Sequence, residues 1–133
     1  MSEPTRNDSF VSEFSGVQAE AYQVNLLNGW WGRRSNIVSM CAADGINYSP
    51  HLAIELLGLV HSEISEAVEA ARKHDSETWK DYTKPDTMVR EMAGAIVRLM
   101  DMAQYFELPL GKAILSEIEA NRQRGFRHGG KAA

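Results

Sequence analysis

The sequence predicts an all-α fold, an antiparallel bundle of about four helices. Apolar residues recur at helical spacing along several long segments, and no alternating pattern of useful length predicts a β-strand. Residues that favour helix starts and stops, such as Ser49-Pro50 and Asn28-Gly29, bound these segments. With 133 residues, of which 44% are hydrophobic, the chain fits one globular domain over residues 1–133.

Two helices are expected in the first half of the chain. The first covers residues 9–27. Residues 32–47 are rich in Gly, Ser, Asn and Asp and predict a loop. The second helix begins with Ser49 as its cap and Pro50 as its first residue, and it continues to about residue 74.

Two more helices are expected in the second half. After a polar connection over residues 76–84, a third helix begins at Pro85 or Asp86 and continues to about residue 106. A fourth begins at Pro109 and continues to about residue 123. The second and third helices, joined by a short link, should lie antiparallel and form the centre of the core. The third helix carries one apolar stripe, formed by Met88, Met92, Ala95, Ile96, Leu99, Met100 and Ala103. Its methionines are expected to pack in the core or at a subunit interface.

Composition excludes several classes of protein. A net charge of −4 argues against a protein that coats nucleic acid polymers, since such binding depends on a surplus of Lys and Arg. Cys41 is the only cysteine, so an internal disulfide is excluded and a reducing compartment is the simplest fit. No apolar run approaches the roughly 18 to 20 residues of a membrane span, and residues 1–10 lack the apolar core of a signal peptide. We therefore expect a soluble, cytoplasmic protein with no membrane partner, and flexible termini at residues 1–8 and 125–133.

The segment HSEISEAVEAARK, residues 61–73, contains acids that are not equivalent. A helix turns by about 100° per residue, so the apolar side chains around Val60 form one arc. Glu63 lies inside this arc, Glu66 lies at its edge, and Glu69 points nearly the opposite way. A buried, ionised carboxylate requires a partner. The partner of Glu63 is an Arg or Lys side chain, a divalent cation shared with Glu66, or a second subunit.

A further acidic position favours the metal. On the third predicted helix, Glu91 lies at the edge of the apolar arc. If the second and third helices pack antiparallel, the carboxylates of Glu63, Glu66 and Glu91 converge between them. Oxygen ligands alone indicate a hard cation, Mg²⁺ or Mn²⁺, rather than zinc.

The chain contains, in this order, the motifs HSEISEAVEAARK, REMAGAIVRLMD and NRQRGFRHGGK. Together they resemble the MazG-like group of all-α nucleoside triphosphate pyrophosphohydrolases, and NGWW, residues 28–31, resembles segments of its phage and bacterial members. In that family an E-x-x-E pair and an E-x-x-D pair on successive helices hold Mg²⁺ against the substrate phosphates. Glu63 and Glu66 match the first pair, and Glu91 matches the first member of the second. Gly94 stands where the aspartate is expected.

The resemblance implies a reaction and an assembly. A (deoxy)nucleoside triphosphate would be hydrolysed between its α and β phosphates to a monophosphate and pyrophosphate. Glu63, Glu66 and Glu91 would be the metal ligands and catalytic residues. Members of the family are dimers or dimers of dimers, so the resemblance also implies a homodimer or homotetramer that assembles through helix faces.

Gly94 leaves two other functions open. A member weakened by the missing ligand would bind nucleotides as a sensor or regulator, and a helical assembly module would bind no ligand. Asp101 cannot replace the ligand, because ten residues place it roughly 15 Å along the helix from Glu91. We expect Asp101 to pair with Arg98 or with a neighbouring helix. A glycine inside a helix costs about 1 kcal/mol relative to alanine, so Gly94 either leaves room for a ligand or a close helix contact, or merely tolerates the packing.

Further substrate contacts are expected outside the acidic segments. By resemblance, Asn121, Arg124 and Lys131 match positions near the phosphates, and Arg and Lys side chains suit a polyphosphate. The alternative for this segment is a solvated terminus. Trp30 and Trp31 offer flat surfaces on which a base stacks, although tryptophans close to a helix end are more often core anchors.

Overall fold

The computed structural model describes residues 5–125, which form six helices and the turns between them. No strand occurs in this range, so the prediction of an all-α fold is confirmed for the part of the chain that the structure describes. In chain order the helices are α1 (Arg6–Leu27), α2 (Gly32–Ala43), α3 (Ser49–Lys73), α4 (Ser76–Trp79), α5 (Met88–Tyr105) and α6 (Leu110–Arg124).

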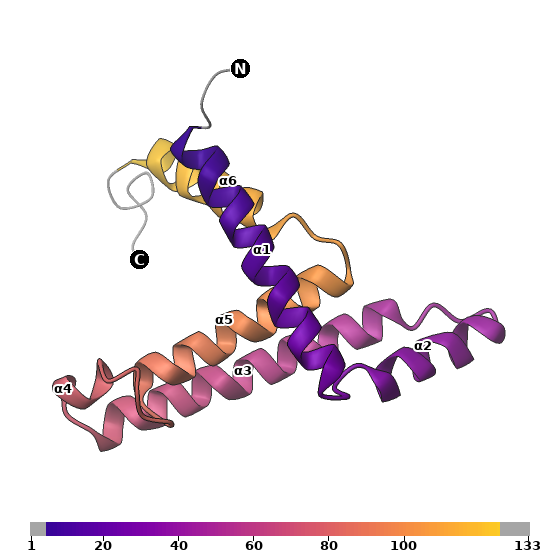
Figure 1. Cartoon of the computed structure of the whole chain (residues 1–133), viewed down its shortest axis with the longest axis horizontal. Helices are drawn as coiled ribbons and strands as arrows, with labels where there is room; N and C mark the ends of the chain where they lie inside the picture. The colour runs from indigo at the N-terminus through magenta and orange to yellow at the C-terminus, as the bar shows by residue number, and fades with distance from the viewer. Residues whose placement is uncertain (1–4, 126–133) are drawn as a thin grey trace.

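The two long helices α3 and α5 lie side by side and antiparallel, as predicted (Figure 1). The one-turn helix α4 closes their shared end and contacts both of them. Helix α1 crosses this pair and packs on α5, and α6 packs along the other part of α1 (Figure 1). Between residues 5 and 125, no helix combines the length and the apolar character needed to cross a membrane.

Residues 32–47 were expected to form a loop, and this expectation is wrong. Helix α2 occupies most of the segment, beginning where the Ser35 amide donates to the Trp31 carbonyl at 2.8 Å. The helix stops only near Gly45, whose φ of +77° is the left-handed conformation that glycine adopts most readily. Single Ser and Asn residues inside the segment were misread as breakers, because they do not prevent a helix that is anchored at both ends.

Several helix boundaries also differ from the prediction. Helix α1 begins at Arg6 because Thr5 and Asp8 cap it reciprocally, so the helix starts three residues earlier than predicted. Helix α3 begins at Ser49 with Tyr48 before it, so Ser49 is not the cap. Residues 1–4 and 126–133, which belong to the predicted flexible termini, lie outside the described residues.

The later boundaries are set by local backbone conformation. Helix α5 begins at Met88 rather than at Pro85 or Asp86, because Asp86 has a φ of +64° and the Thr87 hydroxyl accepts the Arg90 amide as a helix cap. Within the predicted polar connection, Asp75 caps the single turn of α4 in the same way. Helix α6 begins one residue after Pro109.

The buried core lies where the end of α1 meets α3 and α5. Trp31 is fully buried, and its ring stacks on Tyr105 with centroids 4.3 Å apart. Asp101 is also buried and accepts two hydrogen bonds, from Trp31 Nε1 at 2.8 Å and from Asn25 Nδ2 at 2.7 Å. Burial raises the pKa of Asp101, and these two hydrogen bonds oppose that shift. The neighbouring-helix partner expected for Asp101 is therefore observed, whereas Arg98 pairs elsewhere.

Among residues 5–125, no other helix covers one face of the α3–α5 pair. Ala95, Met100 and Ala103 of the predicted core stripe are buried, but Met92 and Ile96 remain about half-exposed. Helix α1 packs on the opposite side of α5, where its Asn25 and Gln18 side chains donate hydrogen bonds to Asp101 and Gln104. Met92 and Ile96 are therefore not buried by the residues that the structure describes. On α3, the uncovered face carries Ile54, Leu57, Ile64 and Val68.

Candidate functional site

The carboxylates of Glu63, Glu66 and Glu91 converge between α3 and α5 and form what we call the acid cluster. Glu63 and Glu66 lie one turn apart on α3, and Glu91 lies in the first turn of α5. One carboxylate oxygen from each residue lies within 4.8 Å of the others. The antiparallel packing thus brings the three predicted acids together.

The acid cluster makes Glu91 harder to ionise than a free glutamate. Burial, followed by hydrogen bonding and charge repulsion from Glu66 and then Glu63, raises the pKa of Glu91 to about 7. Glu69 takes no part in this, because it points to solvent and pairs with Lys73 at 3.4 Å. The predicted difference between Glu69 and the other two acids of α3 is confirmed.

Arg98 is the direct partner of Glu63. Its Nε donates to Glu63 Oε1 at 2.7 Å, and the Glu63 side chain is only 17% exposed. This contact is the arginine alternative left open by the sequence. Pairing with Arg98 was one of the two alternatives expected for Asp101, and it is not the one observed, because Asp101 is bound by Asn25 and Trp31.

Gly94 lies against the acid cluster, and its lack of a side chain has a local reason. A Cβ atom at this position would be 2.9 Å from Glu63 Oε2 and 3.4 Å from Glu63 Cδ. Such a distance is too short for a normal contact, so a side chain here would displace the Glu63 carboxylate. Of the readings left open by the sequence, the close approach of a side chain from α3 is the one observed.

A hollow of about 430 Å³, here called the Gly94 cavity, opens beside the acid cluster. It brings an acid, two guanidinium groups and an indole ring together in one place. Arg90 and Arg98 were not predicted as site residues, although both follow from the helical period, since each lies one turn from Gly94 on the same face of α5. The cavity is lined by Asn25, Trp30, Glu63, Arg90, Ala93, Gly94, Val97 and Arg98.

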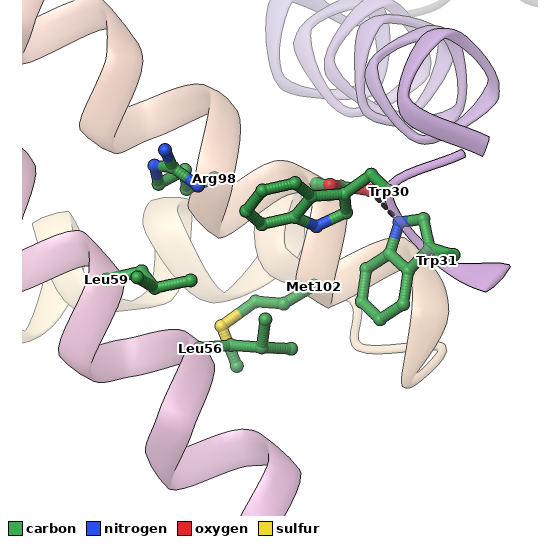
Figure 2. A pocket seen from close by; sticks show the side chains of 7 residues that line it. Trp30, Trp31, Leu56, Leu59, Arg98 and Met102 are labelled. Atoms are coloured by element: carbon green, nitrogen blue, oxygen red, sulfur yellow. Dashed lines mark hydrogen bonds between the residues drawn. The ribbon is translucent and has the colours of Figure 1, made fainter. Parts of the chain in front are cut away.

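The two adjacent tryptophans have different positions. Trp31 is a core anchor, as described above, so its ring is not available to a base in this structure. Trp30 lines the Gly94 cavity, with the guanidinium carbon of Arg34 4.1 Å from its ring centroid and that of Arg98 at 5.0 Å. Figure 2 shows the Trp30 ring extending from the turn toward Arg98, with Met102 and Leu56 beneath. The space enclosed there is about 10 Å³, enough for one water molecule at most.

The predicted C-terminal contacts lie elsewhere in the chain. Asn121 and Arg124 are close to the end of α6, where Arg124 Nη1 donates to Asn121 Oδ1 at 2.8 Å. Helix α6 packs on α1 and extends away from the α3–α5 pair (Figure 1). Within one chain, the structure therefore does not bring Asn121 and Arg124 to the acid cluster. Lys131 lies outside the described residues.

Comparison of the chain with models of protein families, with curated proteins and with solved structures finds no match. The functional assignment therefore depends on the residues of the site, their geometry and the resemblance of their motifs.

Proposed function

We propose that the protein is a divalent-metal-dependent pyrophosphohydrolase that converts (deoxy)nucleoside triphosphates to monophosphates and pyrophosphate. The observation that carries this proposal is the convergence of three carboxylates from two antiparallel helices. The Gly94 cavity beside them has the size and the polar groups of a small-molecule site. The order of the motifs, which resembles that of MazG-like enzymes, supports the same reaction.

The acid cluster fits a hard cation. Three carboxylate oxygens within 4.8 Å match the ligand preference of Mg²⁺ and Mn²⁺. Mg²⁺ is usually held by one or two carboxylates together with waters and substrate phosphates, so an acid at position 94 is not essential. When bound, such an ion supplies positive charge for the phosphate oxygens and lowers the pKa of a water molecule.

The residues of the chain divide the remaining tasks. Glu63, Glu66 and Glu91 hold the cation, and one of them accepts the proton of the attacking water. The exposed part of the Trp30 ring offers a face for the base. The tight packing of α3 against α5 keeps the three carboxylates in place, as catalysis by positioned groups requires.

A regulator that binds nucleotides without turnover is the second candidate. The observation that favours it is the pairing of Glu63 with Arg98 over Gly94, since one acid of the set is absent and another already has a cationic partner. In this case the same residues bind a metal and a nucleotide, but the ligand set is too weak to activate a water.

We also propose a homodimer or homotetramer. Ile54, Leu57, Ile64 and Val68 fall on one stripe of α3 and are between 44% and 70% exposed. Met92 and Ile96 on α5 are also about half-exposed. In such an assembly Asn121 and Arg124 serve the site of a neighbouring subunit, because α6 lies away from the acid cluster of its own chain.

The test is incubation of the purified protein with Mg²⁺ and a panel of ribo- and deoxyribonucleoside triphosphates, with pyrophosphate and monophosphate measured separately. Turnover should be lost in Glu66→Gln and kept in Glu69→Gln, which changes an acid of the same helix that pairs with Lys73 in solvent. Nucleotide binding without turnover would support the regulator. A protein that binds neither Mg²⁺ nor nucleotide would overturn both candidates and leave a helical assembly module.

A further inference from the structure

Arg98 lies at the boundary between the acid cluster and the Gly94 cavity. Its guanidinium is bound to Glu63 on one side and lies near the Trp30 ring on the other. The side chain is 33% exposed, and it forms part of the cavity wall. It therefore contacts both the place where a cation fits and the place where a ligand fits.

A cation in the acid cluster would compete with Arg98 for Glu63. Both carry positive charge, and the Glu63 carboxylate already uses Oε1 for the Arg98 bond while Oε2 lies over Gly94. A divalent ion that takes Glu63 as a ligand weakens the ion pair and repels the guanidinium. Released from Glu63, Arg98 has the cavity beside it, since its side chain already forms part of the cavity wall.

The cavity already has a second guanidinium for an anion. Arg90 lies one turn before Gly94 and Arg98 one turn after it, so the two cationic side chains lie on either side of the glycine on one face of α5. Arg90 Nη1 donates to the Tyr82 carbonyl at 3.2 Å, and this bond does not involve Nε or Nη2, which can donate to an anion. Two guanidinium groups suit a pyrophosphate or triphosphate group, whose negative charge is spread over several oxygens, better than they suit a single carboxylate.

We propose that the Gly94 cavity is a polyphosphate site in which Arg98, released from Glu63 when a divalent cation enters the acid cluster, becomes a ligand of the phosphates. The inference rests on the proposed metal site but not on hydrolysis. Binding of the cation and binding of the anion then strengthen each other, since each favours the same position of Arg98. In the cation-free protein, Glu63 binds Arg98 and keeps it away from the position in which it would contact the phosphates.

Titration calorimetry on the full chain tests this with two probes, Mn²⁺ alone and pyrophosphate at saturating Mn²⁺. In Arg98→Gln the affinity for Mn²⁺ should rise several-fold, because the competitor for Glu63 is gone. The affinity for the Mn²⁺-pyrophosphate complex should fall at least about tenfold, because a charged hydrogen-bond donor is lost. Arg98→Lys, which keeps the charge, should stay close to the wild type for Mn²⁺ and lose part of the pyrophosphate affinity.

Arg34→Gln is the matched control. Arg34 also lies over Trp30 and pairs with Glu55 at 3.7 Å, but it does not line the Gly94 cavity. Its removal changes the net charge by the same amount and should leave both affinities within about twofold. Circular dichroism and the melting temperature of each variant establish that it is folded.

Opposite changes of the two affinities in Arg98→Gln would support the proposal. A Mn²⁺ affinity that stays unchanged would overturn the competition, and an unchanged pyrophosphate affinity would overturn the phosphate contact. Opposite changes in a protein that hydrolyses no nucleotide would support this inference while overturning the hydrolase. A wild-type protein that does not bind Mn²⁺ would overturn both.

Discussion

The Glu63 carboxylate occupies the space beside Gly94 that a side chain at position 94 would fill. Its Oε2 atom lies 2.9 Å from the point where a Cβ atom would be, and its Oε1 atom accepts a hydrogen bond from Arg98 at 2.7 Å. The missing acid and the arginine contact are therefore connected, because the space at Gly94 lets Glu63 lie along α5 toward Arg98. Any larger residue at position 94 disturbs this contact.

Gly94→Asp should tighten the binding of divalent cations and raise the turnover of nucleoside triphosphates. The new carboxylate adds an oxygen ligand beside Glu63, whose flexible end can move aside. We expect the affinity for Mn²⁺, measured by titration calorimetry, to rise about tenfold or more. Gly94→Asn is the control, because it fills the same space without the charge. Equal effects of the two substitutions would contradict a role for the added ligand.

Trp31→Phe should destabilise the fold by at least about 2 kcal/mol, measured by urea unfolding at a fixed protein concentration. The substitution removes the donor at 2.8 Å from the buried Asp101 carboxylate and shrinks a fully buried ring. Trp79→Phe is the matched control, since the Trp79 Nε1 atom is buried without an acceptor among the residues that the structure describes. That change should cost less than about 1 kcal/mol. Similar losses in both variants would refute the importance of the Asp101 contact.

Without divalent cations, the protein should become less stable as the pH rises. The pKa of Glu91 is raised from 4.5 to about 7, so between these values the folded chain holds a proton that the unfolded chain has lost. The contribution of this proton to folding stability is fully present below the pKa of Glu91 in the unfolded chain. It is lost as the pH rises through the pKa of Glu91 in the folded chain. In EDTA, the melting temperature should therefore be lower at about pH 8 than at about pH 5, and Mg²⁺ should restore part of it at the higher pH.

Glu91→Gln provides the check on this pH dependence. The amide does not titrate, so the fall in melting temperature between the two pH values should shrink in the variant. A fall that is as large as in the wild type would show that another group causes it.

Val68→Asp should shift the protein toward monomers in analytical ultracentrifugation. Val68 is 52% exposed on the apolar stripe of α3, and in the proposed subunit interface a carboxylate at this position would be buried without a partner. Val17→Asp is the matched control, because Val17 is 48% exposed but lies on α1. Both variants remaining oligomeric would exclude the α3 stripe as the interface. Dissociation of both would extend the interface to α1.

The helical period alone predicted much of the site. It placed Glu63 among apolar neighbours and separated Glu69 from the other acids, because the angular position of a residue on a helix depends only on its number. It could not name Arg98 as the partner of Glu63. The height at which two antiparallel helices face each other depends on their connection, here shaped by α4 and by Asp86 at positive φ.

Two features of the sequence could not be read from composition, because the conformation of a turn decides them. Trp30 and Trp31 both lie in the turn between α1 and α2, and both pack at the core, but only Trp31 is fully buried. Which of the two rings is buried depends on the turn at Gly29, with its φ of +83°, and composition does not report such a conformation. Helix α2 was missed for a related reason, since its ends are set by contacts of Trp31 and Gly45 rather than by its own weak apolar pattern.

The Asp101 contact has a consequence for how variants of this protein are sorted. Trp31 is bound to α5 through Asp101, and Trp30 is the preceding residue. The position of the Trp30 ring at the cavity therefore depends on the position of Trp31. A substitution that breaks the Asp101 contact would let Trp31 move. The Trp30 ring at the cavity would then shift as well, by a displacement much smaller than unfolding requires. Under the proposed function, a selection for nucleotide binding would therefore score Asp101 as a functional position, although its carboxylate is buried in the core.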